Sequence, residues 1–416
     1  MHIAHRLLAT VVVATWGISP AAGQTAPPSA VSPTGAPSST APRSTAPRST
    51  APIVKPDADS SRRVLVRLPA DSLLAGRGAS SDLVVARLHC ENGPQSVVIL
   101  PSGELIEVAA NEATPTDRPF VAATKDELAS ALTSGKLSGF KTKQTKRFLY
   151  VYNSSELFYQ GTSRILETMY PGVLTYCKRQ KLDVHEADLP LVIVMFRTQA
   201  EFDAFRKMPP GVVAYYDGLS NAVYMYEMSK LAQVSADLAL KQAVSTVAHE
   251  GVHQILMNIG VQQRLSSWPM WISEGLAEFF APTDVTHDVR WKGIATVHDM
   301  RMAELEHYVK NTGRKVKAGE TLRATVMAPN LTSTGYASAW ALTHFLSQKR
   351  PTEFAAFLQD VSRREPLAQF EPDADETVFT KRFGTDYAAL ESLELKHLRS
   401  LPYVNPLTVR GLKFAK

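Results

Sequence analysis

The most informative stretch of the chain reads His249-Glu250-Gly251-Val252-His253. It falls within a segment, from about residue 235 to 258, whose residue pattern is typical of a helix. Residues four positions apart share one helix face, so His249 and His253 can hold a single metal ion between them. Glu250 would then lie beside the metal, where it can take a proton from a water molecule. The stretch therefore predicts a metal site on a helix. The alternative is two histidines on an ordinary solvated or buried helix face.

A second motif follows, because a catalytic zinc usually has three protein ligands and an open position for water. Residues 271–280 read Trp-Ile-Ser-Glu-Gly-Leu-Ala-Glu-Phe-Phe, and Glu274 lies 21 positions after His253. A turn before this segment would fold a second helix back across the first, which makes Glu274 the candidate third ligand. Glu278, one turn further on, is placed to fix the tautomer of a ligand histidine. The alternative is two surface carboxylates, but the apolar neighbours indicate burial, and a buried carboxylate needs a cation or hydrogen bonds.

The two motifs together resemble the gluzincin metallopeptidases. More narrowly, they resemble a family of secreted bacterial proteins of unknown function in the peptidase MA-like clan. The resemblance covers roughly residues 145–400 and implies a Zn²⁺ ion bound by His249, His253 and Glu274, with Glu250 as general base. It also implies that Tyr336 stabilises the oxyanion, with His344 in reserve. The alternative for Tyr336 is a core tyrosine.

The resemblance implies an activity: zinc-dependent hydrolysis of peptide bonds in exported or envelope proteins. Aminopeptidases of this clan carry a Gly-x-Met-Glu-Asn string that holds the substrate's amino group, and the sequence has none. An endopeptidase acting on peptide or protein substrates is therefore expected. In many such enzymes an edge strand pairs with the substrate, and residues 222–226 are the candidate for it. The competing hypothesis is a catalytically inactive zinc-binding envelope or interaction protein.

The N-terminal region predicts export. Residues 1–23 have a weakly basic start, a short apolar core and small residues before a cleavage point, which is typical of a signal peptide. An uncleaved anchor is the alternative. Residues 24–60 form a linker rich in Pro, Ser, Thr and Ala, which cannot bury apolar surface. No later segment approaches the length of a membrane span. The expected location is periplasmic, in the cell envelope or extracellular.

The charge distribution argues against a nucleic-acid partner. The net charge is +5, but residues 1–56 hold four cations and no carboxylate, so +1 remains for residues 57–416. The folded part is therefore nearly neutral, without the basic footprint of a nucleic-acid-binding protein. Cys90 and Cys177 could form one disulfide or remain two separate thiols, and their spacing does not decide between these alternatives.

The remaining pattern predicts an α+β fold. Short β-branched runs indicate a small β-rich N-terminal module over residues 61–140. Residues 145–416 are expected to form the gluzincin-like domain, with a mixed sheet and a largely helical C-terminal half. Within it we expect strands at 148–152, 189–196, 212–216 and 222–226, and helices at 155–180 and 200–207.

Overall fold

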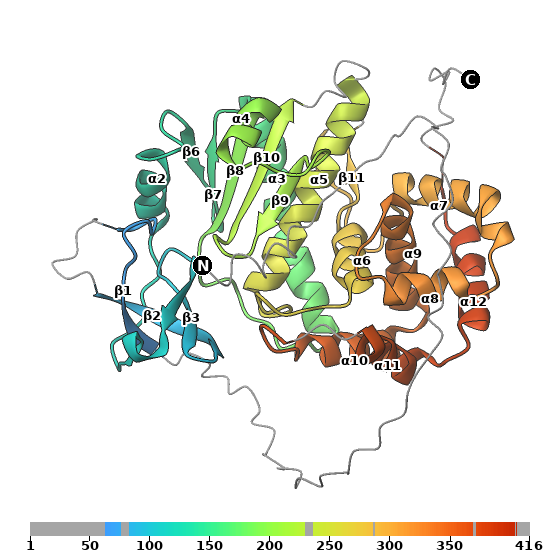
Figure 1. Cartoon of the computed structure of the whole chain (residues 1–416). Helices are drawn as coiled ribbons and strands as arrows, with labels where there is room; N and C mark the ends of the chain where they lie inside the picture. Colours follow the sequence, from blue (N-terminus) through green and yellow to red (C-terminus); the bar gives the residue numbers. More distant parts are fainter. Residues whose placement is uncertain are drawn as a thin grey trace, which may run out of the picture.

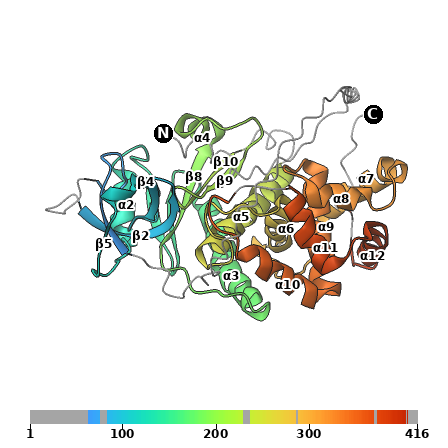
Figure 2. The ribbon, with the colours of Figure 1, turned by 60° about the horizontal axis from the view of Figure 1, so that its bottom comes forward.

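The computed structural model describes residues 63–75, 83–228, 236–285, 288–368, 372–403 and 405. The predicted signal peptide and linker lie outside these residues. The fold is α+β, as expected: a β-rich N-terminal region is followed by a mixed sheet and then by helices (Figure 1). Figure 2 shows the same succession of three parts from another side. In the described part, no helix combines the length and the apolar character that crossing a membrane requires.

The N-terminal sheet is antiparallel throughout. Its strands are β1 (Arg63–Arg67), β2 (Leu83–Asn92), β3 (Gln95–Ile99), β4 (Leu105–Ala109) and β5 (Thr114–Pro115), in the spatial order β4-β3-β2-β1-β5. A cluster of buried valines and leucines fills its inner face. Cys90 in β2 and Cys177 in a later helix are free thiols, so the open question of a disulfide is answered.

The second sheet is mixed and has the order β6-β7-β8-β10-β9. Its strands are β6 (Lys141–Gln144), β7 (Phe148–Tyr152), β8 (Leu191–Thr198), β9 (Ala214–Asp217) and β10 (Ala222–Met228). Strands β7, β8 and β10 are parallel, whereas β6 and β9 pair antiparallel with their neighbours. The expectation that residues 222–226 form the edge strand is wrong. Strand β10 pairs with β8 on one side and with β9 on the other, so β9 is the edge strand. The apolar residues 222–226 are buried, as expected for a central strand.

Helices cover both faces of this sheet because side chains alternate along its strands. Phe148, Tyr150 and Tyr152 point toward α3 (Glu156–Arg179) and α5 (Ala236–Asn258). Leu149 and Val151 point to the other face, in the cluster that includes α2 (Lys125–Thr133) and α4 (Gln199–Phe205). Helix α2, which lies within the expected N-terminal module of residues 61–140, packs on the second sheet.

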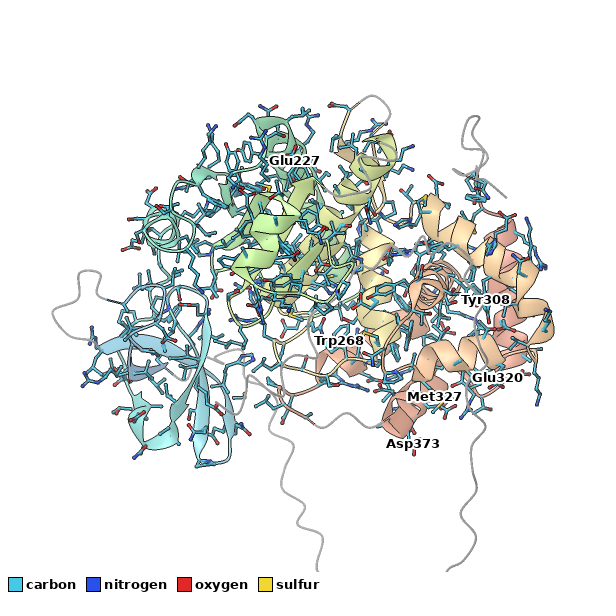
Figure 3. The ribbon with its side chains drawn as sticks, turned by 45° about the horizontal axis from the view of Figure 1, so that its top comes forward. Glu227, Trp268, Tyr308, Glu320, Met327 and Asp373 are labelled. Atoms are coloured by element: carbon cyan, nitrogen blue, oxygen red, sulfur yellow. The ribbon has the colours of Figure 1, made fainter. Side chains whose placement is uncertain are left out.

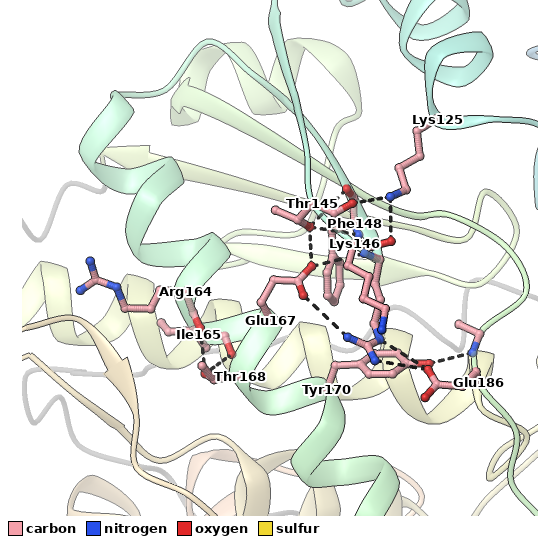
Figure 4. Close-up of polar contacts among 12 residues, drawn as sticks. Lys125, Thr145, Lys146, Phe148, Arg164, Ile165, Glu167, Thr168, Tyr170 and Glu186 are labelled. Atoms are coloured by element: carbon pink, nitrogen blue, oxygen red, sulfur yellow. Dashed lines mark hydrogen bonds and ion pairs between the residues drawn. The ribbon is translucent and has the colours of Figure 1, made fainter.

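A polar cluster attaches the turn between β6 and β7 to the flanking helices (Figure 4). Glu167 of α3 accepts a hydrogen bond from the Thr145 hydroxyl and lies 3.8 Å from the Arg147 guanidinium. Lys125 of α2 donates to the backbone carbonyls of Thr145 and Lys146. These contacts connect α2 and α3 to the same turn from opposite sides of the sheet.

The second half of the chain is largely helical. After α5 come α6 (Met270–Phe280), α7 (Asp299–Asn311), α8 (Glu320–Met327), α9 (Ser333–Lys349), α10 (Pro351–Ser362), α11 (Pro372–Phe383) and α12 (Tyr387–Arg399). Short 3-10 turns lie at Ala110–Glu112 and Gly313–Lys315, and a small hairpin pairs β11 (Thr283–Asp284) with β12 (Arg290–Trp291). Helix α9 packs against α6, α7, α8, α10 and α12, so it is the centre of this half.

Candidate metal centre

Helices α5 and α6 bring the three predicted ligands together. Helix α5 carries His249 and His253 and ends at Asn258, just before Gly260 turns the chain with a φ of 87°. Helix α6, which lies beside α5 in Figure 1, carries Glu274. The Nε2 atom of His249 is 3.2 Å from Glu274 Oε2 and 3.3 Å from His253 Nε2. The distance from His253 Nε2 to Glu274 Oε2 is 3.7 Å.

These distances fit a common metal ion. Ligand atoms about 2.0–2.2 Å from a tetrahedral zinc lie about 3.3–3.6 Å from one another. The observed separations of 3.2, 3.3 and 3.7 Å match this triangle closely. All three side chains are no more than 2% exposed. The His249–His253–Glu274 group could therefore hold a metal ion, as the sequence predicted.

The charges of the group show what a metal would replace. Burial lowers the pKa of His249, but the carboxylates of Glu274 and Glu278 raise it to about 10. Burial raises the pKa of Glu274, but His253 and His249 together bring it down to about 2. Without a metal, His249 therefore carries the positive charge that balances the carboxylates. A bound cation would displace this proton, because a ligand histidine must be neutral.

Glu250 lies next to the ligands and is held by the edge strand. Its Oε2 atom accepts a hydrogen bond of 2.8 Å from the backbone N–H of Tyr216 in β9. Its Oε1 atom is buried and has no hydrogen-bond partner among the described residues. Burial raises the pKa of Glu250 to about 7, against the opposing effect of His249 and His253. This is a fixed carboxylate with one free oxygen and a pKa suited to proton transfer near neutral pH.

Glu278 lies behind His249 and is paired on all sides. Its Oε1 atom is 3.2 Å from His249 Nδ1 and accepts a 2.7 Å hydrogen bond from the Arg301 guanidinium. Its Oε2 atom is 3.2 Å from His298 Nε2. Glu278, Arg301 and His298 are each no more than 5% exposed. The carboxylate therefore orients the His249 ring, and α7 supplies its counter-charge.

Sequence reasoning missed Arg301 and His298. It predicted that a buried carboxylate at Glu278 needs a cation or hydrogen bonds. It did not identify the partners, because no sequence spacing links a single arginine of α7 to α6. The cap of α7 offers a weak local signal, since the His298 ring accepts the backbone N–H of Arg301 at 3.5 Å.

Tyr336 and His344, both on α9, have different surroundings. The Tyr336 ring lies 6.1 Å from the His249 ring and 5.3 Å from the Arg301 guanidinium carbon. Burial and the nearby carboxylates raise the pKa of Tyr336, so its hydroxyl stays protonated. His344 instead has both ring nitrogens engaged away from the metal ligands, at 3.0 Å from His397 Nε2 and 3.2 Å from the Ala295 carbonyl. Tyr336 is therefore at the site, and the reserve candidate His344 is not.

Two glycines allow the helices that carry the site to approach closely. A Cβ atom on Gly251 would collide with the side chain of Leu166 in α3. A Cβ atom on Gly275 would collide with the Thr343 hydroxyl and lie 2.7 Å from the Ala339 carbonyl, both in α9. The glycine inside the first motif, which is unfavourable in a helix by about 1 kcal/mol, thus permits the packing of α3 on α5.

A buried amide network holds α5 on the sheet. Gln254 donates to the backbone carbonyls of Val192 in β8 and of Asn221 just before β10, at 3.0 and 2.9 Å. Asn258 donates to the Asn221 side chain at 2.7 Å. Because Gln254 directly follows His253, these bonds also fix the rotation of the metal-binding helix.

Comparison with known proteins gives a match over part of the chain. Residues 243–368 match the model of a family described as a protein of unknown function (DUF1570). The matched segment includes all three candidate ligands together with Glu250, Glu278, Arg301 and Tyr336. No curated protein matches the chain.

Proposed function

We propose that the protein is a gluzincin-type zinc metallopeptidase that cleaves peptide bonds as an endopeptidase. The observation that carries the proposal is the triangle of His249, His253 and Glu274 beside a buried Glu250 oxygen without a partner. Two imidazoles and one carboxylate are the ligand set of catalytic zinc sites in this class. The predicted signal peptide favours substrates among exported or envelope proteins.

The side chains have separable roles in this hydrolysis. When bound, Zn²⁺ would supply a Lewis acid that polarises the scissile carbonyl and lowers the pKa of a water. Glu250 accepts a proton from the attacking water on Oε1 and delivers it to the nitrogen of the leaving amine. The hydrogen bond from Tyr216 N–H to Oε2 keeps the carboxylate in place during both transfers.

Tyr336 and Glu278 support the reaction from either side of His249. The Tyr336 hydroxyl, which stays protonated, donates a hydrogen bond to the carbonyl oxygen as that oxygen gains negative charge. Glu278 keeps the Nδ1 atom of His249 toward itself, so that Nε2 faces the metal position.

Metal content tests the foundation of the proposal. We expect the purified protein to hold one zinc per chain by plasma mass spectrometry and the His253→Ala variant to lose most of it after dialysis. His307→Ala, which removes an exposed histidine of α7, is the matched control and should keep its zinc. Equal zinc in the wild type and His253→Ala would overturn the proposed site.

Peptide cleavage tests the reaction. Glu250→Gln should retain zinc but lose cleavage of a mixed peptide library by about 10²–10⁴-fold, the usual contribution of a general base. Tyr336→Phe should keep zinc and lower kcat by about 10²-fold, as expected for one oxyanion donor. A zinc-loaded wild type without any cleavage would instead favour an inactive zinc-binding protein.

A further inference from the structure

A cavity of about 70 Å³ lies among α7, α8, α9 and α12, apart from the metal centre. All four helices contribute polar side chains to its wall: Tyr308 from α7, Thr321 and Thr325 from α8, Ser338 from α9, and Glu391 and Glu394 from α12. Leucines and a valine from the same helices make up most of the rest. Figure 3 labels Tyr308 of α7 and Glu320, the first residue of α8. One water needs about 10–15 Å³ of cavity volume, so a cavity of about 70 Å³ has room for about five non-hydrogen atoms.

Glu394 is the unusual member of this wall. It is 7% exposed, and no described residue donates a hydrogen bond to it or pairs with it. Glu391, one turn earlier, also lines the cavity, but it accepts hydrogen bonds from Gly319 N–H at 2.8 Å and Leu322 N–H at 3.2 Å. The carboxylate of Glu391 therefore caps α8, whereas that of Glu394 has no structural partner.

The side chains that line the cavity indicate which kind of ligand it can bind. Two carboxylates and no lysine, arginine or histidine line the cavity, so a cation is favoured. Burial, with Glu391 nearby, raises the pKa of Glu394 to about 8, as expected for a carboxylate in a wall without a cation. Ca²⁺ and Mg²⁺ require six or more oxygen ligands, counting water, which the apolar walls do not provide. An ammonium group on a short alkyl stem matches both the acidic and the apolar part of the wall.

We propose that this cavity binds a small free primary amine in its alkylammonium form. The ammonium group contacts the Glu394 carboxylate, with the hydroxyls of Thr321 and Ser338 as further acceptors. The alkyl stem lies on Leu322 and Leu342. The site is independent of the proposed hydrolysis, because it shares none of its side chains.

Calorimetric titration with n-butylammonium, and with neutral n-butanol of the same size, tests the proposal. The wild type should bind the ammonium at least about tenfold more tightly than the alcohol. Glu394→Gln should reduce this preference to about twofold or less, while Glu320→Gln, an exposed change of the same charge, should keep it. Equal binding of amine and alcohol by the wild type, or an undiminished preference in Glu394→Gln, would overturn the site.

A second measurement needs no variant. Crystals of the wild type soaked with 3-bromopropylammonium should show an anomalous bromine peak inside the cavity near Leu342. A cavity that holds only water at saturating amine would refute the proposal. Zinc content and peptide cleavage enter neither experiment, so failure of the amine site is distinguishable from failure of the metallopeptidase.

Discussion

Two buried carboxylates in the helical half have opposite surroundings. Glu278, at the metal centre, is 2% exposed and contacts Arg301, His249 and His298. Burial alone would raise the pKa of Glu278, but Arg301 and His249 hold it well below its usual range. Glu394, in the α12 cavity, is 7% exposed without a counter-charge, and burial raises its pKa to about 8. Burial thus acts in the same direction on the pKa of both carboxylates, and the neighbouring cations decide whether the carboxylate stays charged.

The strongest test of this contrast removes the partner of Glu278. Arg301→Met leaves a buried carboxylate without its main counter-charge, which costs about 3–5 kcal/mol in comparable buried pairs. We expect a loss of that size in the free energy of unfolding, measured by urea denaturation. Zinc affinity should fall as well, because His249 loses its oriented partner.

Two comparisons make the Arg301 result interpretable. Arg290→Met breaks the exposed pair with Asp284 and should cost less than about 1 kcal/mol. The double variant Arg301→Met with Glu278→Gln should be less destabilised than the sum of its two single variants, since no buried charge is left alone. Equal losses in the free energy of unfolding for Arg301→Met and Arg290→Met would mean that the buried pair contributes no more to stability than an exposed one.

A second test acts on α9, the helix shared by the two regions. It presents Tyr336 to the metal centre and Ser338 to the cavity. Gly275→Ala would force α6 away from the Ala339 carbonyl, and overpacking of this kind costs about 1–3 kcal/mol. We expect a lower free energy of unfolding and weaker zinc binding.

The control for Gly275→Ala is Gly135→Ala, where a new Cβ meets nothing within 4 Å. Its effect on stability should stay within about 0.5 kcal/mol. If Gly275→Ala and Gly135→Ala have the same free energy of unfolding and the same zinc binding, the close contact of α6 and α9 does not determine the geometry of the metal centre.

Local patterns predicted most of the fold. The apolar run of β7 and the long amphipathic stretch of α3 have their periodicity in adjacent residues, so their existence was predictable. The order of strands was not, because β10 becomes a central strand only through pairing with both β8 and β9. For the same reason the packing of α2 on the second sheet was not predictable, since its apolar face does not reveal which sheet it will cover.

The candidate site also has parts that local sequence predicts and parts that depend on tertiary packing. His249, Glu250 and His253 lie within one helical turn of one another, and Glu274 belongs to the second motif, so the ligand triangle was predictable. The need of a buried Glu278 for a cation or for hydrogen bonds was predictable as well, from its apolar neighbours. The identity of that cation was not, because Arg301 reaches it from α7 through tertiary packing. The Glu394 cavity needs four helices to form and left no pattern in the sequence.

The smallest expected effect concerns the titration of Glu394. Its pKa in the folded protein, about 8, exceeds the ordinary value of 4.5, so folding favours the protonated form. This contribution to stability is complete below about pH 4.5 and is lost as the pH rises through about 8.

The Glu394→Gln variant has no titrating proton at this position. We therefore compare the free energies of unfolding of Glu394→Gln and the wild type in amine-free buffer. The difference, variant minus wild type, should be larger at pH 8.5 than at pH 4.5 by on the order of 1–2 kcal/mol. The full shift would correspond to more, but the effective dielectric constant of protein interiors, about 20, reduces the cost of the buried charge. A constant difference between the two proteins across this range would mean that Glu394 is solvated as an ordinary surface carboxylate. The contrast with Glu278 would then disappear.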